Sequence, residues 1–350
     1  MSDTRLPESG QQAGKSRHRR HGFSRRSGRH TSDETVLAAL DLGTNNCRLL
    51  VARPNKRGFS VIDAFSRIVR LGEGLGRSGH LSEPAMDRTI EALKVCADKM
   101  HRRRVTRSRV VATEACRQAE NCDEFLLRVR DRTGLVIEII SNQEEAELAL
   151  NGCVPLLDPT IPDAIVFDIG GGSTEIAWAK RDAAGIRQEL AVMSIPIGVV
   201  TLAERFGGDS YEPEDYRAMI RELADPIRCF DEEHGIAKIF SDGRAQMVGT
   251  SGTVTTLAGV HLKLPRYVRD RVDGVYLKYE QVRRVADDLA TMNFAGRAAQ
   301  PCIGTERADL VVAGCAILEA ILDRWPAPRI RVGDRGVREG ILFGLMEDQP

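Results

Sequence analysis

The amino-acid sequence predicts an α/β protein built from two similar domains that face each other across a cleft. The chain has 350 residues, and at roughly 150 residues per domain this length suggests about two domains. Apolar runs typical of strands alternate with amphipathic segments typical of helices, which indicates an α/β fold with a mixed or parallel sheet. One strand–turn–strand unit also occurs twice, so each half is expected to contribute one turn to the cleft.

The first half is expected to begin with strands. Apolar runs at 36–40 and 47–52 are joined by a polar turn, and a third strand is expected at 59–65. Ser82 is then expected to cap a helix that has Pro84 in its first turn. The remaining elements expected in this half are strands at 109–112 and 135–140 and a helix at 123–132.

The second half is expected to begin with a helix at 141–153. Residues 141–144 read SNQE, which matches a capping box, in which Ser and Glu each bond the other's backbone N–H. Prolines at 155, 159 and 162 break the chain after this helix. The later expected elements are strands at 165–167, 175–179 and 330–332 and helices at 214–230, 280–292, 307–325 and from about 337.

The repeated unit aligns without gaps, because residues 40–48 read LDLGTNNCR and residues 167–175 read FDIGGGSTE. Turns of this composition direct consecutive backbone N–H groups at an anion, although a single Gly-rich hairpin is more often only a hairpin. An Asp beside a phosphate requires a cation between them, so Asp41 and Asp168 predict a Mg²⁺ site. The phosphate-binding candidates in the two turns are Gly43, Thr44, Asn45, Asn46, Gly170, Gly171, Gly172, Ser173 and Thr174.

A third Gly-rich segment lies at 249–257, where GTSGTVTTL follows an apolar strand and continues with helical spacing. Gly-rich turns that lead into a helix N-terminus are anion sites, because free N–H groups and the helix dipole attract negative charge. An ordinary strand–turn–helix junction capped by Ser or Thr is the alternative. The candidates added by this segment are Gly249, Thr250, Ser251, Gly252 and Thr253.

Over residues 37–346 these motifs together resemble the exopolyphosphatase / guanosine pentaphosphate phosphohydrolase (Ppx/GppA) family. That family belongs to the superfamily of sugar kinases, actin and heat-shock chaperones. The most specific segments are 39–46, 112–117, 144–146, 168–175, 249–258 and 334–340. The resemblance implies two ribonuclease H-like domains flanking a central cleft. It also implies Mg²⁺-dependent release of the terminal phosphate from inorganic polyphosphate or guanosine pentaphosphate.

The resemblance places the catalytic base at Glu145, the residue directly before Ala146 in the family's motif. In the first turn of a helix the macrodipole favours the ionised carboxylate, whereas repulsion from Glu144 and Glu147 opposes it. First-turn acids are common for structural reasons alone, so this assignment depends on the resemblance.

Four further positions bear on the cleft. Arg117 is a candidate phosphate ligand through its bidentate guanidinium, with an ordinary surface arginine as the alternative. Glu175 has the spacing of an outer-shell group of the metal site. Arg335 and Arg338 are expected to brace the final helix rather than to line the cleft.

The chain departs from the family pattern at two positions. Glu147 stands where the family usually has Arg, and Glu114 stands where a small or neutral polar residue is common. Both acids are expected to lower the affinity of the site for a polyanion or to alter its substrate preference. They keep open a non-hydrolytic regulator that binds guanosine tetra- or pentaphosphate, and a phosphotransferase of the same superfamily is the other alternative. The choice between polyphosphate and guanosine pentaphosphate also stays open.

The expected organisation has three parts: a disordered basic tail at 1–33, a first domain at 34–143 plus 334–350, and a second domain at 144–333. The tail carries many Arg and His residues and almost no aliphatic ones, so it cannot bury enough surface to fold. A tether for polyanions is its second interpretation. The balance of 50 Lys+Arg against 50 Asp+Glu argues against a surface that binds nucleic acid or membrane throughout.

The eight cysteines include no Cys-x-x-Cys pair, which excludes zinc-site spacing and favours a reducing, cytoplasmic location. No apolar run approaches the ~18 residues of a membrane span. The resemblance implies a homodimer, which nothing else in the sequence supports.

Overall fold

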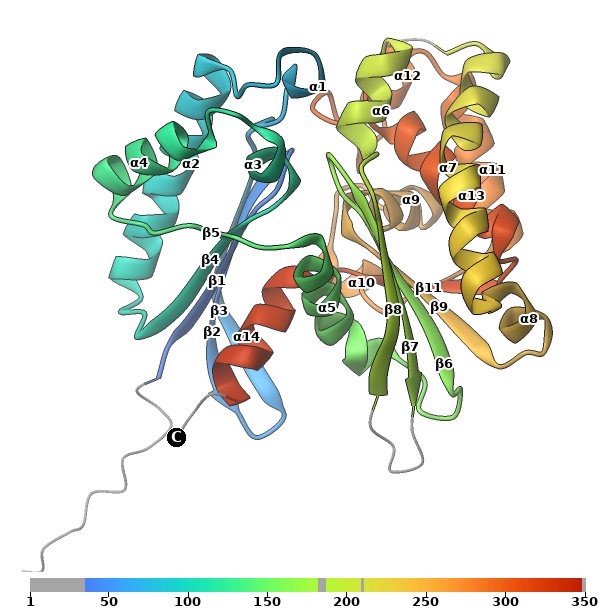
Figure 1. The fold of residues 1–350 in the computed structure, drawn as a ribbon, viewed down its shortest axis with the longest axis horizontal. Helices are drawn as coiled ribbons and strands as arrows, with labels where there is room; N and C mark the ends of the chain where they lie inside the picture. Colours follow the sequence, from blue (N-terminus) through green and yellow to red (C-terminus); the bar gives the residue numbers. More distant parts are fainter. Residues whose placement is uncertain (1–34, 182–186, 209–210, 348–350) are drawn as a thin grey trace, which may run out of the picture. The chain divides into compact units, whose positions relative to one another are not determined.

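The computed structural model describes residues 35–181, 187–208 and 211–347. The predicted tail at 1–33 lies outside the described residues. Two β-sheets dominate the described part of the chain, and each sheet has helices packed against it (Figure 1). No helix in these ranges is long and apolar enough to cross a bilayer.

The first sheet has the strand order β3-β2-β1-β4-β5. β1 pairs antiparallel with β2 and parallel with β4, and β2 pairs antiparallel with β3. The strand expected at 135–140 is reduced to the two residues of β5, which pair parallel with β4. The strands are β1 (Leu37–Leu42), β2 (Asn46–Asn55), β3 (Gly58–Ile68), β4 (Arg107–Ala112) and β5 (Glu138–Ile139).

The second sheet has the order β10-β11-β9-β6-β7-β8. Read from β8, it repeats the first sheet: three antiparallel strands, then β9 parallel to β6 and β11 parallel to β9. This repetition confirms the predicted duplication. The strands are β6 (Asp163–Ile169), β7 (Thr174–Arg181), β8 (Arg187–Ile195), β9 (Ala245–Thr250), β10 (Tyr276–Lys278) and β11 (Arg329–Gly333). Sequence reasoning missed β8 and β10.

Each sheet has one face covered by long helices. On the first sheet, α2 (Glu83–Arg102) and α4 (Cys122–Thr133) bury their apolar faces against β1 and β2. Ser82 caps α2 as expected, because its hydroxyl accepts the N–H of Ala85. The helices that pack with the second sheet are α7 (Pro213–His234), α9 (Ser251–His261), α11 (Tyr279–Thr291) and α13 (Val311–Arg324).

Shorter helices connect the main elements. They are α1 (Leu75–Ser78), α3 (Glu114–Gln118), α6 (Val199–Phe206), α8 (Ile236–Ser241), α10 (Arg269–Val272) and α12 (Phe294–Ala298), with a 3₁₀ turn at Val154–Leu156. Of these, α3 and α6 contact the candidate site described below.

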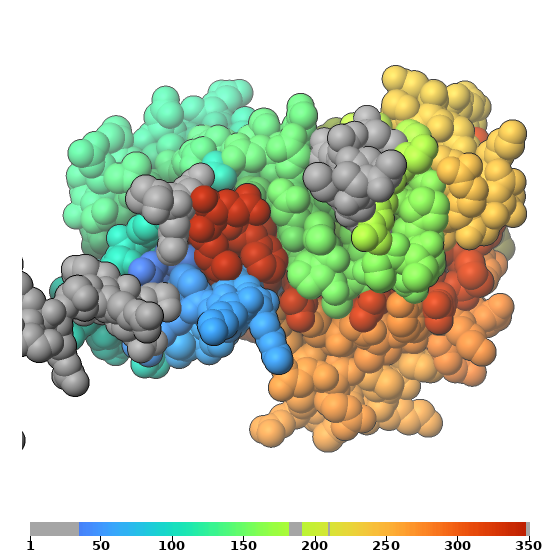
Figure 2. Space-filling view, turned by 90° about the horizontal axis from the view of Figure 1, so that it is seen from below, coloured from blue at the N-terminus to red at the C-terminus, as the bar shows by residue number. Residues whose placement is uncertain are grey.

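The facing sides of the two sheets are covered by one helix each. α14 (Val337–Glu347) packs on the first sheet through Ile341 and Leu342. Its Phe343 ring lies 5.2 Å from that of Phe59 at the β2–β3 turn, and Figure 2 shows α14 beside this hairpin. α5 (Asn142–Cys153) packs on the second sheet. We keep the two domain limits expected from the sequence as a proposal.

The two helices α5 and α14 meet backbone to backbone. A Cβ added at Gly152 of α5 would lie 2.1 Å from the carbonyl oxygen of Gly336, and one added at Gly340 of α14 would lie 2.1 Å from that of Leu148. Real Cβ atoms do not approach this closely, so only glycine permits the contact. The crossing fixes the distance between the two halves of the fold at this point.

Candidate active site

The repeated unit forms two hairpins with the same turn. In the first hairpin the N–H of Gly43 donates to the carbonyl of Asn46 at 2.9 Å, and in the second the N–H of Gly170 donates to the carbonyl of Ser173, also at 2.9 Å. Residues that align without gaps in the sequence therefore also make equivalent hydrogen bonds in the two turns.

The two hairpins differ in charge at one equivalent position. Asp41 of β1 lies opposite Arg48 of β2, whereas Asp168 of β6 lies opposite Glu175 of β7. The first hairpin thus pairs its aspartate with a guanidinium, and the second pairs its aspartate with another carboxylate.

The turns of the two hairpins touch each other. A Cβ on Gly171 would lie 3.0 Å from Cβ of Thr44, and one on Gly172 would lie 2.6 Å from Oγ1 of Thr44. Glycine at these positions therefore permits close approach of the two loops. The approach brings both turns to one pocket.

The N-terminus of α6 orients the second loop. The N–H groups of Val199 and Val200 donate to the carbonyls of Gly170 and Gly171 at 3.0 and 2.8 Å. These carbonyls are therefore directed at α6. Within the described part of the chain, the N–H groups of Gly171, Gly172 and Ser173 have no hydrogen-bond partner. This pattern matches a loop that offers its amides to an anion.

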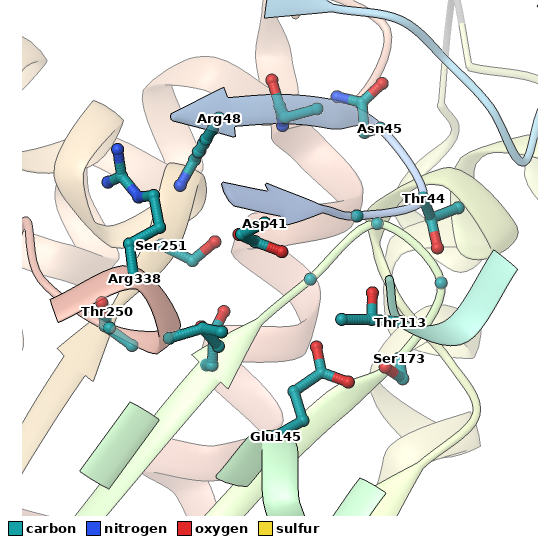
Figure 3. Close-up of a pocket in the computed structure, with 18 of the residues that line it drawn as sticks. Asp41, Thr44, Asn45, Arg48, Thr113, Glu145, Ser173, Thr250, Ser251 and Arg338 are labelled. Carbon is teal, nitrogen blue, oxygen red and sulfur yellow. The ribbon is translucent and has the colours of Figure 1, made fainter. Parts of the chain in front are cut away.

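One pocket gathers most of the residues singled out in the sequence (Figure 3). The predicted residues that line it are Asp41, Gly43, Thr44, Asn45, Asn46, Glu145, Asp168, Gly170, Gly171, Gly172, Ser173, Thr250 and Ser251. Sequence reasoning did not propose Arg48, Thr113, Asp334, Gly336 and Val337, and it favoured bracing of the final helix over a place in the cleft for Arg335 and Arg338. The pocket therefore receives residues from both hairpins, from α5, from the start of α9 and from α14.

Several predicted phosphate ligands do not line this pocket. A Cβ on Gly249 would lie 2.4 Å from the Phe167 ring, so close packing accounts for that glycine. The hydroxyl of Thr174 is buried and donates to the carbonyl of Ile197 at 2.7 Å. Gly252 and Thr253 line a neighbouring cavity instead. Arg117 and Glu175 are also outside the pocket lining. Both nevertheless act on Glu145, which lines it: Arg117 by a hydrogen bond and Glu175 by raising its pKa.

Glu145 projects from the first turn of α5 into the pocket (Figure 3). The capping box is only half formed: Ser141 accepts the N–H of Glu144 at 3.1 Å, but the Glu144 side chain pairs with Arg109. The ion pair with Arg109 of β4 therefore replaces the expected hydrogen bond between the Glu144 carboxylate and the N–H of Ser141. The helix cap survives, and Glu145 keeps its place in the first turn.

Arg117 is not among the residues that line the pocket, and it is not a free surface arginine, so its role as a phosphate ligand stays a prediction. Its Nη2 donates to Oε2 of Glu145 at 2.8 Å and its Nε to Oε2 of Glu114 at 2.9 Å. Its Nη1 donates to the carbonyl of Ile140 at 2.9 Å. The guanidinium thus holds the candidate base by one oxygen. Glu114, one of the two departures from the family pattern, is a partner of this guanidinium.

Burial dominates the acid–base properties of the site. It raises the pKa of Glu145 well above its ordinary value; the nearby Glu175 adds to the rise and Arg117 opposes it. Burial also raises the pKa of Asp168 to about 6 and that of Glu175 to about 7, and it raises the pKa of Asp41. Each carboxyl is driven toward its neutral form unless a cation joins it.

The expected repulsion from Glu144 and Glu147 is not what raises the pKa of Glu145. Glu144 is paired with Arg109, and Glu147 accepts a hydrogen bond from Gln143 at 3.0 Å. The carboxylates that raise the pKa of Glu145 are Glu175 on β7 and Asp41 on β1. Sequence spacing along one helix cannot reveal a neighbour of this kind.

Two guanidinium groups balance the carboxylates. Arg48 and Arg338 both lower the pKa of Asp41 and of Asp168. Neither makes an ion pair or hydrogen bond with a described residue. Arg338 thus lines the pocket instead of only bracing α14, whereas Arg335 lines the pocket and also pairs with Asp273 at 2.8 Å. The sequence could have predicted Arg48 as a site residue, because it lies opposite Asp41 across a short hairpin.

A wider groove adjoins the pocket. It shares Arg48, Asp334 and Arg338 with the pocket, and its walls include Arg67 and Arg307. Positive side chains therefore continue from the pocket into the groove.

The residues of the pocket fit a Mg²⁺ ion that is shared with a phosphate. The described residues contain no group of three or more His, Cys, Asp or Glu side chains placed to hold a metal by themselves. Mg²⁺ does not need one, because it is bound by one or two carboxylates together with waters and phosphate oxygens. Asp41 and Asp168 provide two carboxylates, and Oδ1 of Asn45 and Oδ1 of Asn46 are buried without a hydrogen-bond partner in the described structure.

Comparison with known proteins gives consistent matches. Residues 50–349 match the model of the Ppx/GppA phosphatase family. The crystal structure of an Aquifex aeolicus Ppx/GppA family member is 30% identical with a TM-score of 0.72, and the match covers 90% of this chain and 99% of that chain.

Two further solved structures agree in fold. One is an exopolyphosphatase from Cytophaga hutchinsonii, 24% identical over 90% of this chain and 99% of that chain, with a TM-score of 0.79. The other is an exopolyphosphatase-like protein, 27% identical over 89% of this chain and 97% of that chain, with a TM-score of 0.76. The predicted fold class, two ribonuclease H-like domains flanking a central cleft, is confirmed.

Proposed function

The chain belongs to the Ppx/GppA phosphatase family, and from this premise we propose that it is a Mg²⁺-dependent phosphoanhydride hydrolase. Its proposed substrates are inorganic polyphosphate and guanosine pentaphosphate, from which it releases the terminal phosphate. The observation that carries the proposal is that Glu145 lines the same pocket as the turns of both hairpins and their aspartates.

In this proposal the substrate is held by backbone. The N–H groups of Gly171, Gly172 and Ser173 bind the terminal phosphate, with Thr44 and Asn45 on the facing turn. Asp41 and Asp168 hold Mg²⁺. When bound, the ion neutralises charge on the phosphoryl oxygens.

Glu145 is the proposed general base. Because Arg117 occupies Oε2, Oε1 is the oxygen left to accept a proton from the attacking water. A raised pKa makes the ionised carboxylate a stronger proton acceptor, and general base catalysis contributes roughly 10²–10⁴-fold. Thr113, at the N-terminus of α3, lines the pocket beside the base.

The test is phosphate release from both substrates, with and without Mg²⁺. Glu145→Gln should abolish turnover and leave the thermal midpoint near the wild-type value. Glu147→Gln is the matched control, since it changes the same residue type on the same helix, where the carboxylate accepts a hydrogen bond from Gln143. Retained turnover in Glu145→Gln would count against the mechanism.

One observation favours a second candidate, the non-hydrolytic regulator. The ion pair with Arg117 stabilises the charge of Glu145 and so weakens it as a base. A regulator would bind guanosine tetra- or pentaphosphate tightly without releasing phosphate, and Glu145→Gln would not change its affinity. Titration calorimetry beside the phosphate assay separates the two functions.

Three accompanying proposals concern the whole chain. The basic residues at 1–33 are proposed to contact polyanions, the chain is proposed to form a homodimer, and its proposed location is the cytoplasm. Deletion of residues 1–33 should reduce the salt dependence of polyphosphate binding. Light scattering of the purified protein measures the oligomeric state.

A further inference from the structure

Glu175 is held by a hydrogen-bonded relay that lies outside the pocket lining. The hydroxyl of Ser194 donates to Oε1 of Glu175 at 2.9 Å, and Nδ2 of Asn142 donates to Oγ of Ser194 at 2.8 Å. Because an amide N–H only donates, Ser194 accepts from Asn142 and its single hydrogen is directed at Glu175. The hydrogen bonds of the relay therefore run in one direction, from Asn142 through Ser194 to Glu175.

The relay links two elements of the site. Ser194 on β8 lies directly opposite Glu175 on β7 in the strand register. Asn142 is the first residue of α5, three positions before Glu145. The helix that carries the candidate base is thus tied to the strand that carries Glu175.

Ser194 donates to one oxygen of Glu175, and Ser173 also lowers the pKa of this carboxyl as a hydrogen-bond partner. Glu175 is only 1% exposed, and its Oε2 is buried without a hydrogen-bond partner in the described structure. The terminal torsion of a Glu side chain has a broad energy minimum, so an unheld carboxylate at this position would rotate. The bond from Ser194 to Oε1 selects one orientation and leaves Oε2 available.

We propose that Ser194 and Asn142 are positioning residues, which hold Glu175 with Oε2 presented to the Mg²⁺ and phosphate side of the pocket and fix it relative to Glu145. This inference rests on the proposed function. Groups that orient residues around a metal typically change its affinity or the activity 10–100-fold when removed. Neither Ser194 nor Asn142 lines the pocket, so their effect passes through Glu175.

The first test compares Ser194→Ala with Ser194→Thr. We expect the alanine variant to lower kcat about 10–100-fold with KM changed less than about 2-fold, and to weaken Mn²⁺ affinity, measured by electron paramagnetic resonance without substrate. Threonine keeps the hydroxyl and is favoured in strands, so Ser194→Thr should retain most of the wild-type kcat and Mn²⁺ affinity. Ser241→Ala is the control, since that hydroxyl donates to the carbonyl of Lys238 on α8.

The second test uses the direction of the relay. Asn142→Ala removes the donor to Ser194 but leaves the Ser194 hydroxyl hydrogen free to bond Glu175, so a mild loss of kcat and Mn²⁺ affinity is expected. Asn142→Asp places an acceptor there, which competes with Glu175 for that hydrogen, so a larger loss of kcat and Mn²⁺ affinity is expected. An Asp in the first helical turn does not destabilise the helix, so the thermal midpoint should not fall with the activity.

Wild-type kcat and Mn²⁺ affinity in both Ser194→Ala and Asn142→Asp would overturn the inference, as would a threonine variant as defective as alanine. If Ser194→Ala does not fold, Asn142→Asp decides. If the wild-type protein releases phosphate from neither substrate, the proposed function fails, and the Mn²⁺ titration of the variants still decides the relay.

Discussion

Arg117 and Glu145 form an ion pair of 2.8 Å between Nη2 and Oε2, with side chains only 15% and 12% exposed. The same guanidinium also pairs with Glu114 at 2.7 Å. One cation therefore holds two largely buried carboxylates, one of which is the proposed base.

Substituting Arg117 should damage both stability and activity. In Arg117→Ala, two largely buried carboxylates lose their cation, and breaking such a pair costs about 3–5 kcal/mol. The pKa of Glu145 should rise further because Arg117 lowers it, so the acidic limb of the kcat/KM profile should move to higher pH. Denaturant unfolding and a pH–rate profile measure the two effects.

Arg128→Ala is the matched control, because Arg128 also pairs with two glutamates, Glu83 and Glu124, but at exposed positions. Exposed pairs contribute about 0–1 kcal/mol. Equal losses of stability in the two variants would show that the Arg117 cluster is not a special buried site.

The metal-free protein should become less stable as pH rises through neutrality. Burial raises the pKa of Asp168 from 3.8 to about 6 and that of Glu175 from 4.5 to about 7. The folded state therefore holds these protons more tightly than the unfolded chain. The stability they contribute is complete below the unfolded values and is lost as pH rises through the folded ones.

Differential scanning calorimetry in chelator should accordingly show a lower thermal midpoint at pH 8 than at pH 5. Asp168→Asn should flatten this slope. Mg²⁺ added at pH 8 should raise the midpoint, since a ligand that binds only the folded state stabilises it. A midpoint that climbs steadily from pH 5 to pH 8 in chelator is incompatible with the raised pKa values.

The crossing of α5 and α14 should not tolerate a side chain. Gly340→Ala would place a Cβ 2.1 Å from the carbonyl oxygen of Leu148, so the helices must separate. Overpacking of this kind costs about 1–3 kcal/mol, and because α5 carries Glu145, kcat should fall as well.

Gly344→Ala on the same helix is the control, since nothing lies within 4 Å of the added Cβ. Alanine is favoured over glycine in a helix by about 1 kcal/mol, so this variant should be slightly more stable than the wild type. Chemical denaturation and steady-state kinetics report both quantities. Equal behaviour of the two variants would refute the close contact.

Arg70 should couple the first turn to the second half of the fold. It pairs with Asp309 at 2.8 Å, and its backbone N–H donates to the carbonyl of Asn45 at 3.0 Å. A double-mutant cycle of Arg70→Ala and Asp309→Ala should give a coupling free energy of about 1 kcal/mol. The single variants should raise KM, because the turn that carries Asn45 loses an anchor. Additive effects on stability would exclude the coupling.

The two hairpins were predictable because their signal is local. An apolar run, an Asp, a Gly and small polar residues are contiguous in the chain, and the structure keeps that order in both copies. The caps of α2 and α5 were likewise readable, since Ser82 and Ser141 lie within three residues of the N–H groups they accept.

The partners of Glu145 were not predictable, because they come from distant elements. Arg117 is 28 positions away in the chain and lies on α3, a different helix from the one that carries Glu145. β8 was missed because it is an edge strand, and among residues 191–195, whose burial is described, only Ile195 is buried, which weakens its apolar pattern. Because β8 was not predicted, nothing in the sequence placed Ser194 opposite Glu175.

The charge difference between the equivalent positions Arg48 and Glu175 gives the pocket an electrostatic polarity. A symmetric duplication would let a linear chain of phosphates enter with either flank first. Here the guanidinium groups of Arg48 and Arg338 are shared with the adjoining groove, whereas Glu175 and Glu145 repel one another on the other flank. In the proposed function, an extended polyanion would lie with its length along the arginines and only its last unit against the acids, which would favour cleavage at the end over cleavage within the chain.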